Sequence, residues 1–179
     1  MREVYSLLID AVDPFTLYTT ISGAQGKPSV LKSQDGGNSW QEGASRVIPI
    51  AADPLRPGRL YGYGYERQRL MISEDGGQSW KETSLPGPFQ SIEVHPRNPE
   101  HLYAGATGLW DEAAGAPLPS SLWHSADSGH TWEQQRLDRH FTSVVLDPGS
   151  EEALYATSGD TLWHSADRGA TWKQLAVLG

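Results

Sequence analysis

The stretch SQDGGNSW at residues 33–40 returns three more times in this 179-residue chain. The other copies are SEDGGQSW at 73–80, SADSGHTW at 125–132 and SADRGATW at 165–172. All four follow the pattern S-x-D-x-G-x-[S/T]-W, and each copy is termed a box below. Their serines stand 40, 52 and 40 residues apart. A repeat of this period predicts an array of similar structural units.

A second motif lies between the boxes in the same register. It is a leucine–tyrosine pair, found at 17–18, 60–61, 102–103 and 154–155. Eight residues before each tyrosine stands a polar residue, which is Asp10, Asp53, His95 or Asp147. Proline follows this residue in the last three repeats, whereas Ala11 takes that place in the first. Asp-Pro favours a tight turn, so each repeat is expected to place a turn ahead of its leucine–tyrosine strand.

Each repeat is expected to form four antiparallel strands. The first is rich in β-branched and aromatic residues, as in FQSIEV at 89–94 and FTSVVL at 141–146. The leucine–tyrosine strand is second, the third ends at the box serine, and the box turns into the fourth. Four-stranded units of about 40 residues are typical of propeller blades. The sequence therefore predicts an all-β propeller of four four-stranded blades in one domain, 1–179, with blades at about 3–43, 44–85, 86–136 and 137–176.

The chemistry of the box explains its residue types. The aspartate can accept backbone N–H groups in a tight turn, the glycine can adopt a positive φ, and the tryptophan can bury a large ring. Because the motif recurs in every unit, these residues are interpreted as structural rather than as metal ligands or catalytic acids. They are Ser33, Asp35, Gly37, Trp40, Ser73, Asp75, Gly77, Trp80, Ser125, Asp127, Gly129, Trp132, Ser165, Asp167, Gly169 and Trp172.

Composition narrows the function classes. The formal net charge of −8 argues against nucleic acid and anionic membrane surfaces as partners. The chain has no cysteine, which excludes disulfides and thiolate metal sites, and no apolar run of about 20 residues. No histidine pair has metal-ligand spacing, so neither a metal nor a cofactor is expected. The first residues lack the long apolar run of a signal peptide, and localisation is left open.

The boxes resemble the Asp-box (BNR) repeats of bacterial sialidases, xyloglucanases, sortilin-type receptors and photosystem II assembly factors. The surrounding pattern of turn proline and leucine–tyrosine strand looks most like the xyloglucanase and assembly-factor group. The resemblance implies a ring, but known members have six, seven or more blades, whereas this chain has four repeats. The expected arrangements are a closed four-bladed ring, half of a larger ring completed by a second chain as a homodimer, or a piece of a longer protein.

Candidate binding residues lie on the connections between strands 2 and 3 and between consecutive blades, which should share one face of the propeller. The third repeat has the longest 2–3 connection, and Trp110, Asp111 and Glu112 stand together at its start. An aromatic ring beside two carboxylates suits a sugar or an acid/base pair. The alternative is a solvated loop. Further candidates for ligand binding are Tyr65, Arg67 and Arg69 of the second repeat and His140 before the fourth.

Glu93 is a third catalytic candidate, because it stands in an innermost strand where the other repeats have Leu8, Ala51 and Val145. Burial there would raise its pKa. A role as a satisfied channel residue is the alternative. His124 and His164 precede the box serine in two repeats, and this repetition favours a structural role.

Two functions follow from these observations. The first is a non-catalytic scaffold that binds a protein or a carbohydrate on the face of the 2–3 and blade-to-blade connections. The alternative is a glycoside hydrolase of sialidase-like or xyloglucanase-like type. The scaffold is favoured because the arginine motif of sialidases is absent, and because one short chain cannot form a cleft between two propellers.

Overall fold

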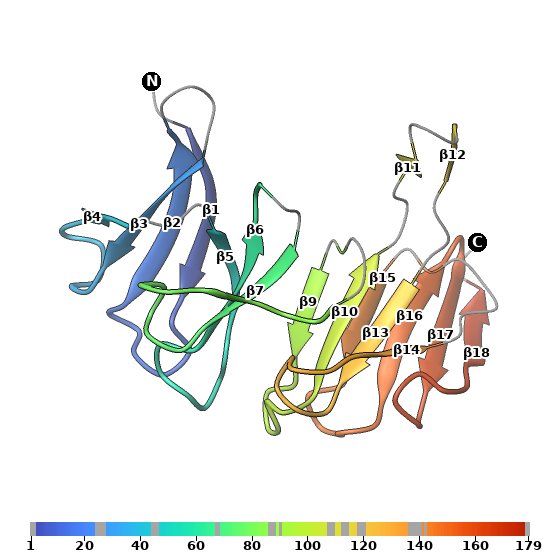
Figure 1. Ribbon diagram of the computed structural model, residues 1–179. Helices are drawn as coiled ribbons and strands as arrows, with labels where there is room; N and C mark the ends of the chain where they lie inside the picture. The colour runs from blue at the N-terminus through green and yellow to red at the C-terminus, as the bar shows by residue number, and fades with distance from the viewer. Residues whose placement is uncertain are drawn as a thin grey trace. The chain divides into compact units, whose positions relative to one another are not determined.

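The structure is a computed structural model that describes residues 3–23, 28–43, 47–66, 69–85, 89, 91–106, 110–111, 115–117, 121–135, 141 and 143–177. The chain forms two compact units, residues 1–85 and 86–179. Each unit contains two four-stranded antiparallel sheets (Figure 1). The predicted all-β fold of four four-stranded blades is confirmed. The grouping of all four blades into one domain stays a prediction.

The first unit holds blades 1 and 2. Blade 1 consists of β1 (Val4–Ile9), β2 (Leu17–Ser22), β3 (Pro28–Ser33) and β4 (Gln41–Glu42). Blade 2 consists of β5 (Val47–Ala52), β6 (Leu60–Gly64), β7 (Arg69–Ser73) and β8 (Lys81–Glu82). In both sheets the strands are hydrogen-bonded in chain order, and β5 packs against β1, β2 and β3 of blade 1.

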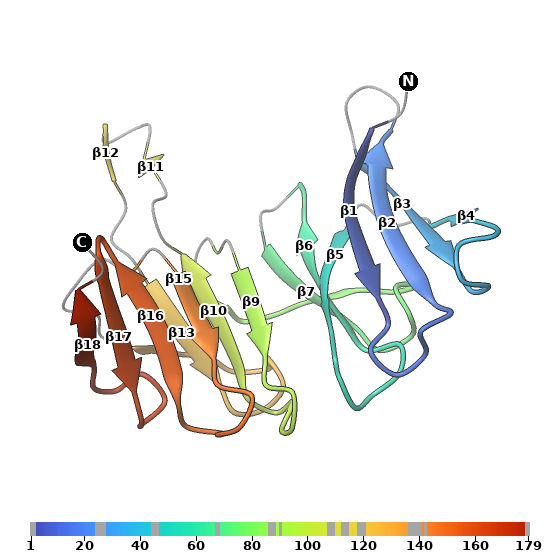
Figure 2. The ribbon, with the colours of Figure 1, turned by 180° about the vertical axis from the view of Figure 1, so that it is seen from behind.

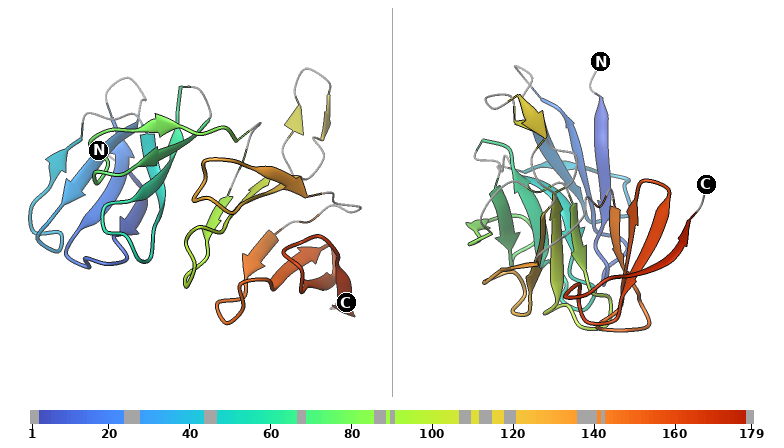
Figure 3. Two further views of the ribbon diagram at one scale, coloured as in Figure 1. Left: turned by 60° about the horizontal axis from the view of Figure 1, so that its bottom comes forward. Right: turned by 90° about the vertical axis from the view of Figure 1, so that its right-hand side faces the viewer.

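The second unit holds blades 3 and 4. Blade 3 consists of β9 (Ser91–Val94), β10 (Leu102–Ala106), β13 (Ser121–Ser125) and β14 (Glu133–Gln135). Blade 4 consists of β15 (Ser143–Leu146), β16 (Leu154–Ser158), β17 (Thr161–Ser165) and β18 (Lys173–Val177). A small hairpin of β11 (Trp110–Asp111) and β12 (Ala116–Pro117) is inserted between β10 and β13, as Figure 2 shows from behind. Figure 3 shows blade 4 in orange to red. Its strands are hydrogen-bonded in chain order.

The two sequence motifs meet in the middle of every sheet. The leucine of each leucine–tyrosine pair lies opposite the box serine, and the tyrosine lies opposite the residue before that serine. The tyrosine pairs are Tyr18 with Lys32, Tyr61 with Ile72, Tyr103 with His124, and Tyr155 with His164. A shared register explains why both motifs recur at the same spacing.

Each box is a hydrogen-bonded turn, seen well in blade 3. The Ser125 hydroxyl donates to Asp127 Oδ1 at 2.8 Å and accepts the Gly129 N–H at 2.8 Å. Asp127 in turn accepts the backbone N–H and the hydroxyl of Thr131, at 2.8 and 2.6 Å. Trp132 Nε1 donates to the Gly129 carbonyl at 3.0 Å. The same bonds recur in the other three boxes.

Two consecutive residues of every box have positive φ, although the repeated glycine accounts for only the second. The first is glycine in unit 1 but Ser128 and Arg168 in unit 2, with φ of 60° and 59°. Its N–H donates to a carbonyl in the turn between the first two strands, as Ser128 does to Glu100 at 2.9 Å. This bond ties the box to the neighbouring turn in all four blades.

Consecutive blades within a unit are joined by the polar residue of the second motif. Asp10 accepts the N–H groups of Val12 and Asp13 through Oδ1 and that of Gly58, in blade 2, through Oδ2 at 2.9 Å. His95 is fully buried and accepts the N–H groups of Arg97 and Asn98 through Nδ1. Its other nitrogen, Nε2, lies 3.1 Å from the Ser150 carbonyl in blade 4. Since Nδ1 is an acceptor, Nε2 carries the proton and donates.

Apolar side chains complete the contact between blades 3 and 4. Tyr103 and Leu122 of blade 3 are buried with Leu154 of blade 4. Blade 4 packs Val144, Leu146 and Trp172 against this cluster, and the Phe141 ring lies 4.5 Å from the Trp172 ring.

Candidate functional site

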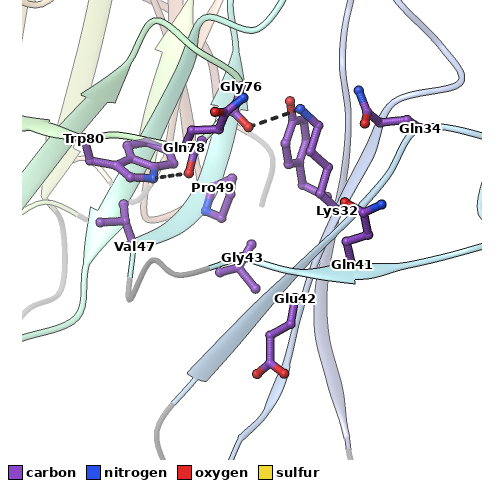
Figure 4. A pocket seen from close by; sticks show the side chains of 13 residues that line it. Lys32, Gln34, Gln41, Glu42, Gly43, Val47, Pro49, Gly76, Gln78 and Trp80 are labelled. Carbon is purple, nitrogen blue, oxygen red and sulfur yellow. Dashed lines mark hydrogen bonds between the residues drawn. The ribbon is translucent and has the colours of Figure 1, made fainter.

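A groove with a cavity volume of about 340 Å³ lies between blades 1 and 2. Figure 4 shows Lys32, Gln34 and Gln41 of blade 1 on one side and Val47, Pro49 and Trp80 of blade 2 on the other. One wall therefore carries an ammonium and two amides, and the other is apolar. Glu42 and Gln78 add a carboxylate and a further amide.

The groove exists because blade 2 has a smaller residue than blade 4 at one position. Val47 stands six residues before Asp53, where the corresponding residue of blade 4 is Phe141. Phe141 packs against Trp172, whereas Val47 lines the groove together with Trp80. A valine side chain leaves free volume beside the indole that a phenylalanine would fill.

Lys32 is held at the edge of the groove by two neighbours. It lies opposite Tyr18 in the sheet, and its Nζ is 5.4 Å from the centre of the Tyr18 ring. The same Nζ donates to the Gly76 carbonyl of blade 2 at 3.4 Å. The corresponding residues of the other blades are Ile72, His124 and His164. Blade 1 thus has a cation with several donors where no other blade has a lysine.

A second, acidic recess of about 250 Å³ adjoins Lys32 from the turn side. Asp10, Asp13, Glu74 and Asp75 line it. Burial works to raise the pKa of Asp10, but its three backbone N–H partners and the charge of Lys32 outweigh burial and lower that pKa. Asp10 is thus an ionised structural acceptor. Within the described part of the chain, no three His, Cys, Asp or Glu side chains converge on a common point that could hold a metal ion.

The buried tyrosines are a feature of the repeat rather than of the groove. Burial raises the pKa of Tyr18, Tyr61 and Tyr103 to about 12. The hydroxyl oxygens of Tyr18 and Tyr103 have no hydrogen-bond partner among the described residues, whereas that of Tyr61 interacts with Arg59. Because the arrangement recurs in three blades, it is not evidence for a nucleophilic tyrosine.

The box aspartates have strongly perturbed pKa values for a structural reason. Hydrogen bonds from Ser39 and Ser79 lower the pKa of Asp35 and Asp75 to about 2. For Asp127, burial works in the opposite direction, but the bonds from Thr131 and Ser125 lower its pKa to about 2 as well. A group that stays ionised to such low pH cannot serve as a general acid near neutrality.

Glu93 is the one catalytic candidate whose side chain the structure describes. It lies in β9 opposite Tyr103, is half-buried, and has a pKa raised by burial. Asp111 belongs to the β11–β12 hairpin, where its backbone pairs with Ala116 and that of Trp110 with Pro117. The side chains of Trp110 and Asp111 lie outside the description, and so does Glu112 altogether.

The binding candidates of the second repeat are only partly described. Tyr65 is exposed in the turn after β6. Arg69 donates to the Leu85 carbonyl at 3.3 Å and forms an ion pair with Glu82 at 3.7 Å, so blade 2 itself engages its guanidinium. Arg67 and His140 lie outside the described residues.

A histidine pair in blade 3 was not expected from the sequence. His101 Nδ1 lies 2.9 Å from His124 Nε2, and the two rings stack with their centres 5.1 Å apart. His124 also stacks on Tyr103 at 4.7 Å. Burial, with smaller effects of His101 and Arg168, lowers the pKa of His124 to about 4. The sequence offered the repeated position of His124 and His164 but no sign that His101 reaches it.

Comparison with solved structures shows which proteins share the fold of this chain. No family model matches the chain, and no curated protein matches it. An ancestral GH74 enzyme aligns with 97% of this chain at 22% identity and a TM-score of 0.73, with 24% of that enzyme covered. The GH74 xyloglucanase of Xanthomonas campestris aligns with 96% of the chain at 19% identity and a TM-score of 0.68, with 30% of that enzyme covered.

A third structure comes from a different class of protein. YCF48 from Cyanidioschyzon merolae aligns with 96% of this chain at 14% identity and a TM-score of 0.57, with 55% of its own length covered. The chain therefore spans between about a quarter and about half of the length of these three structures. The four sheets are blades of the β-propeller fold, and the chain aligns with part of each of these larger propeller chains.

Proposed function

We propose that this chain is a non-catalytic propeller scaffold that binds a protein or a carbohydrate. The observation that carries the proposal is the groove between blades 1 and 2, where a wall of amide and ammonium donors faces an apolar wall with an indole. Sites for small ligands typically combine mostly apolar lining with a few placed polar groups, in volumes of about 300–1,000 Å³. The groove, at about 340 Å³, lies in the lower part of that range.

Its chemistry favours a carbohydrate as the ligand. The C–H faces of a sugar can pack on Trp80 and Pro49, while Gln34, Gln41 and Lys32 can donate to its hydroxyl oxygens. Xyloglucan oligosaccharides are suitable first ligands, since one protein of similar fold is a GH74 xyloglucanase. Trp110 and Asp111, in the β11–β12 hairpin, stay separate candidates for ligand binding.

Calorimetric titration with xyloglucan oligosaccharides tests this proposal. Gln41→Ala and Lys32→Met should each weaken binding about tenfold, because each removes a hydrogen bond donor without removing a buried apolar group. Gln134→Ala is the matched control, since Gln134 is an exposed glutamine on β14, outside the groove. An equal loss in all three variants would contradict the groove as the binding site. If no oligosaccharide binds, the carbohydrate is ruled out and a protein is the remaining class of ligand.

A glycoside hydrolase is the second candidate, and Glu93 is the observation that favours it. A half-buried carboxyl with a raised pKa is suited to donate a proton to a leaving group. Release of reducing ends from the same oligosaccharides would support this function, provided that Glu93→Gln abolishes it while the far-ultraviolet circular dichroism is unchanged. Loss in Asp111→Ala/Glu112→Ala would identify the second carboxylate. We expect no hydrolysis by the parent protein.

A further inference from the structure

The surface of blade 1 formed by Val4, Leu7, Ile9 and Trp40 carries the same positions that blade 4 buries against blade 3. Counted from the polar turn residue and from the box, these four correspond to Phe141, Val144, Leu146 and Trp172 of blade 4. In blade 4, three residues of this set pack on the cluster that includes Tyr103 and Leu122 of blade 3; they are Val144, Leu146 and Trp172. The fourth residue, Phe141, packs against Trp172. We term it the leading face, because it is the face turned toward the preceding blade.

The leading face of blade 1 is uncovered. Val4, Leu7 and Ile9 are 68%, 62% and 52% exposed, and Trp40 is 37% exposed. By contrast, Phe141 is fully buried and Val144, Leu146 and Trp172 are at least half-buried in the second unit. Contiguous exposed apolar side chains at strand positions mark an interaction surface.

Blade 4 offers the complementary surface, termed the trailing face. In blade 3 the trailing face consists of Tyr103 and Leu122, which are buried by blade 4. In blade 1 the corresponding Tyr18 and Val30 are buried and line the groove toward blade 2. The corresponding Tyr155 and Leu162 of blade 4 are only half-buried. Blade 4 thus repeats the residues that already receive a leading face within this chain.

We propose that the leading face of blade 1 docks on the trailing face of blade 4 from a second copy of this chain. A second copy is the occupant that the structure favours for two reasons. The chain aligns with only part of larger propellers, which favours a ring of more than four blades over closure of this chain on itself. The trailing face of blade 4 has the tyrosine and leucine that hold a leading face between blades 3 and 4. Two copies joined head to tail in this way would make two identical contacts.

Light scattering across a range of concentrations gives the first test. The parent chain should have twice the mass of one chain, and Leu7→Arg should reduce it to the mass of one chain with unchanged circular dichroism. Leu7 is exposed within its own chain, so this substitution leaves the fold of blade 1 intact. Leu55→Arg is the matched control, because Leu55 is 59% exposed but lies in a turn of blade 2, outside both faces, and it should stay dimeric. A parent that is monomeric throughout, or a dimer indifferent to Leu7→Arg, overturns the proposal.

Cross-linking identifies which blade covers the face. The chain has no cysteine of its own, so Leu7→Cys and Leu162→Cys can be made singly and mixed. A short bis-maleimide should join the two single variants into a covalent dimer, whereas Leu7→Cys mixed with Glu133→Cys should not be joined. If the double variant Leu7→Cys/Leu162→Cys is cross-linked only within one chain, blade 4 of the same chain is the occupant and a second copy is not. The groove lies between other blades, so this failure would leave the binding proposal standing.

Discussion

At the scale of single residues, the perturbed carboxylates of this protein belong to its turns. Asp127 is held by the hydroxyls of one serine and one threonine and by a backbone N–H, and Asp167 has the same partners. For Asp35 and Asp75 a second serine takes the place of the threonine. Strongly shifted pKa values often mark catalytic sites, so these aspartates could be mistaken for catalytic residues. The structure shows that hydrogen bonding within an eight-residue turn accounts for the shifts.

Replacing Asp127 by alanine should lower the free energy of unfolding by about 1–2 kcal/mol, because several hydrogen bonds within the turn are lost. Urea denaturation at pH 7 measures the loss, and Glu133→Ala, an exposed carboxylate nearby, should change stability little. The pKa of Asp127 in the fold lies near 2, below its ordinary value of 3.8, so its ionised form stabilises the fold above about pH 4. The difference between parent and variant should therefore shrink as the pH falls from 4 to 2.

His124 should make the second unit sensitive to mild acid. Its pKa of about 4 in the fold lies below the ordinary histidine value of 6.5, so the unfolded chain binds the proton more readily. Stability should be fully present above about pH 6.5 and should decline as the pH falls toward 4. His124→Phe keeps a ring against Tyr103 but removes the titration, and it should flatten this part of the curve of unfolding free energy against pH. An equally steep decline in that variant would assign it to other groups.

At the scale of strands and blades, the contact between neighbouring blades depends on how large a side chain the first strand carries. Val47 leaves a groove beside Trp80, while Phe141 packs against Trp172. Gly62 in β6 shows how closely the atoms approach one wall of that groove. A Cβ added there would lie 2.5 Å from Val47 Cγ1 and 2.7 Å from Trp80 Cζ3.

Gly62→Ala should therefore destabilise blade 2 by about 1–3 kcal/mol, since neither neighbour can yield without moving its own contacts. Gly43→Ala is the control, because its added Cβ would meet only the Val30 carbonyl oxygen at 3.4 Å, an ordinary contact. Thermal unfolding of both variants measures the difference. The double variant Val47→Ala/Gly62→Ala should recover part of the loss if the clash with Val47 is its cause.

Much of the element scale could be predicted from the sequence, because it is repeated four times. The register of tyrosine against the residue before the box serine follows from two motifs at constant spacing. The groove could not be predicted in this way, because it depends on the smaller side-chain volume of Val47 at the position that Phe141 occupies in blade 4. The His101–His124 contact was also out of reach, because it depends on side-chain direction within one blade.

At the scale of the whole molecule, the propeller fold predicted from the repeats is confirmed by structures that share no more than 22% identity with this chain. The number of blades in the complete ring is not encoded in any single repeat. In our proposal it depends on which surface covers Val4, Leu7 and Ile9. The sequence alone does not single these residues out, because their counterparts in the other blades are also apolar.

If two copies share a ring, thermal stability should rise with protein concentration, because folding and association are then linked. The melting temperature of the parent should increase by a few degrees for each hundredfold increase in concentration, and scanning calorimetry or fluorimetry can follow it. Leu7→Arg should melt at one temperature at all concentrations. A parent whose melting temperature is independent of concentration would contradict linked association.

The residues that join consecutive blades also fix the order in which the repeats can stand. Asp10 presents an acceptor to an amide of the next blade, whereas His95 presents a donor to a carbonyl. A repeat excised from the third position and inserted in place of the first would bring an imidazole N–H against the Gly58 N–H, donor against donor. The four repeats are similar in sequence, yet they cannot be exchanged for one another without loss of these hydrogen bonds. A longer array engineered by shuffling or duplicating these repeats must therefore keep both partners of each hydrogen bond between consecutive blades.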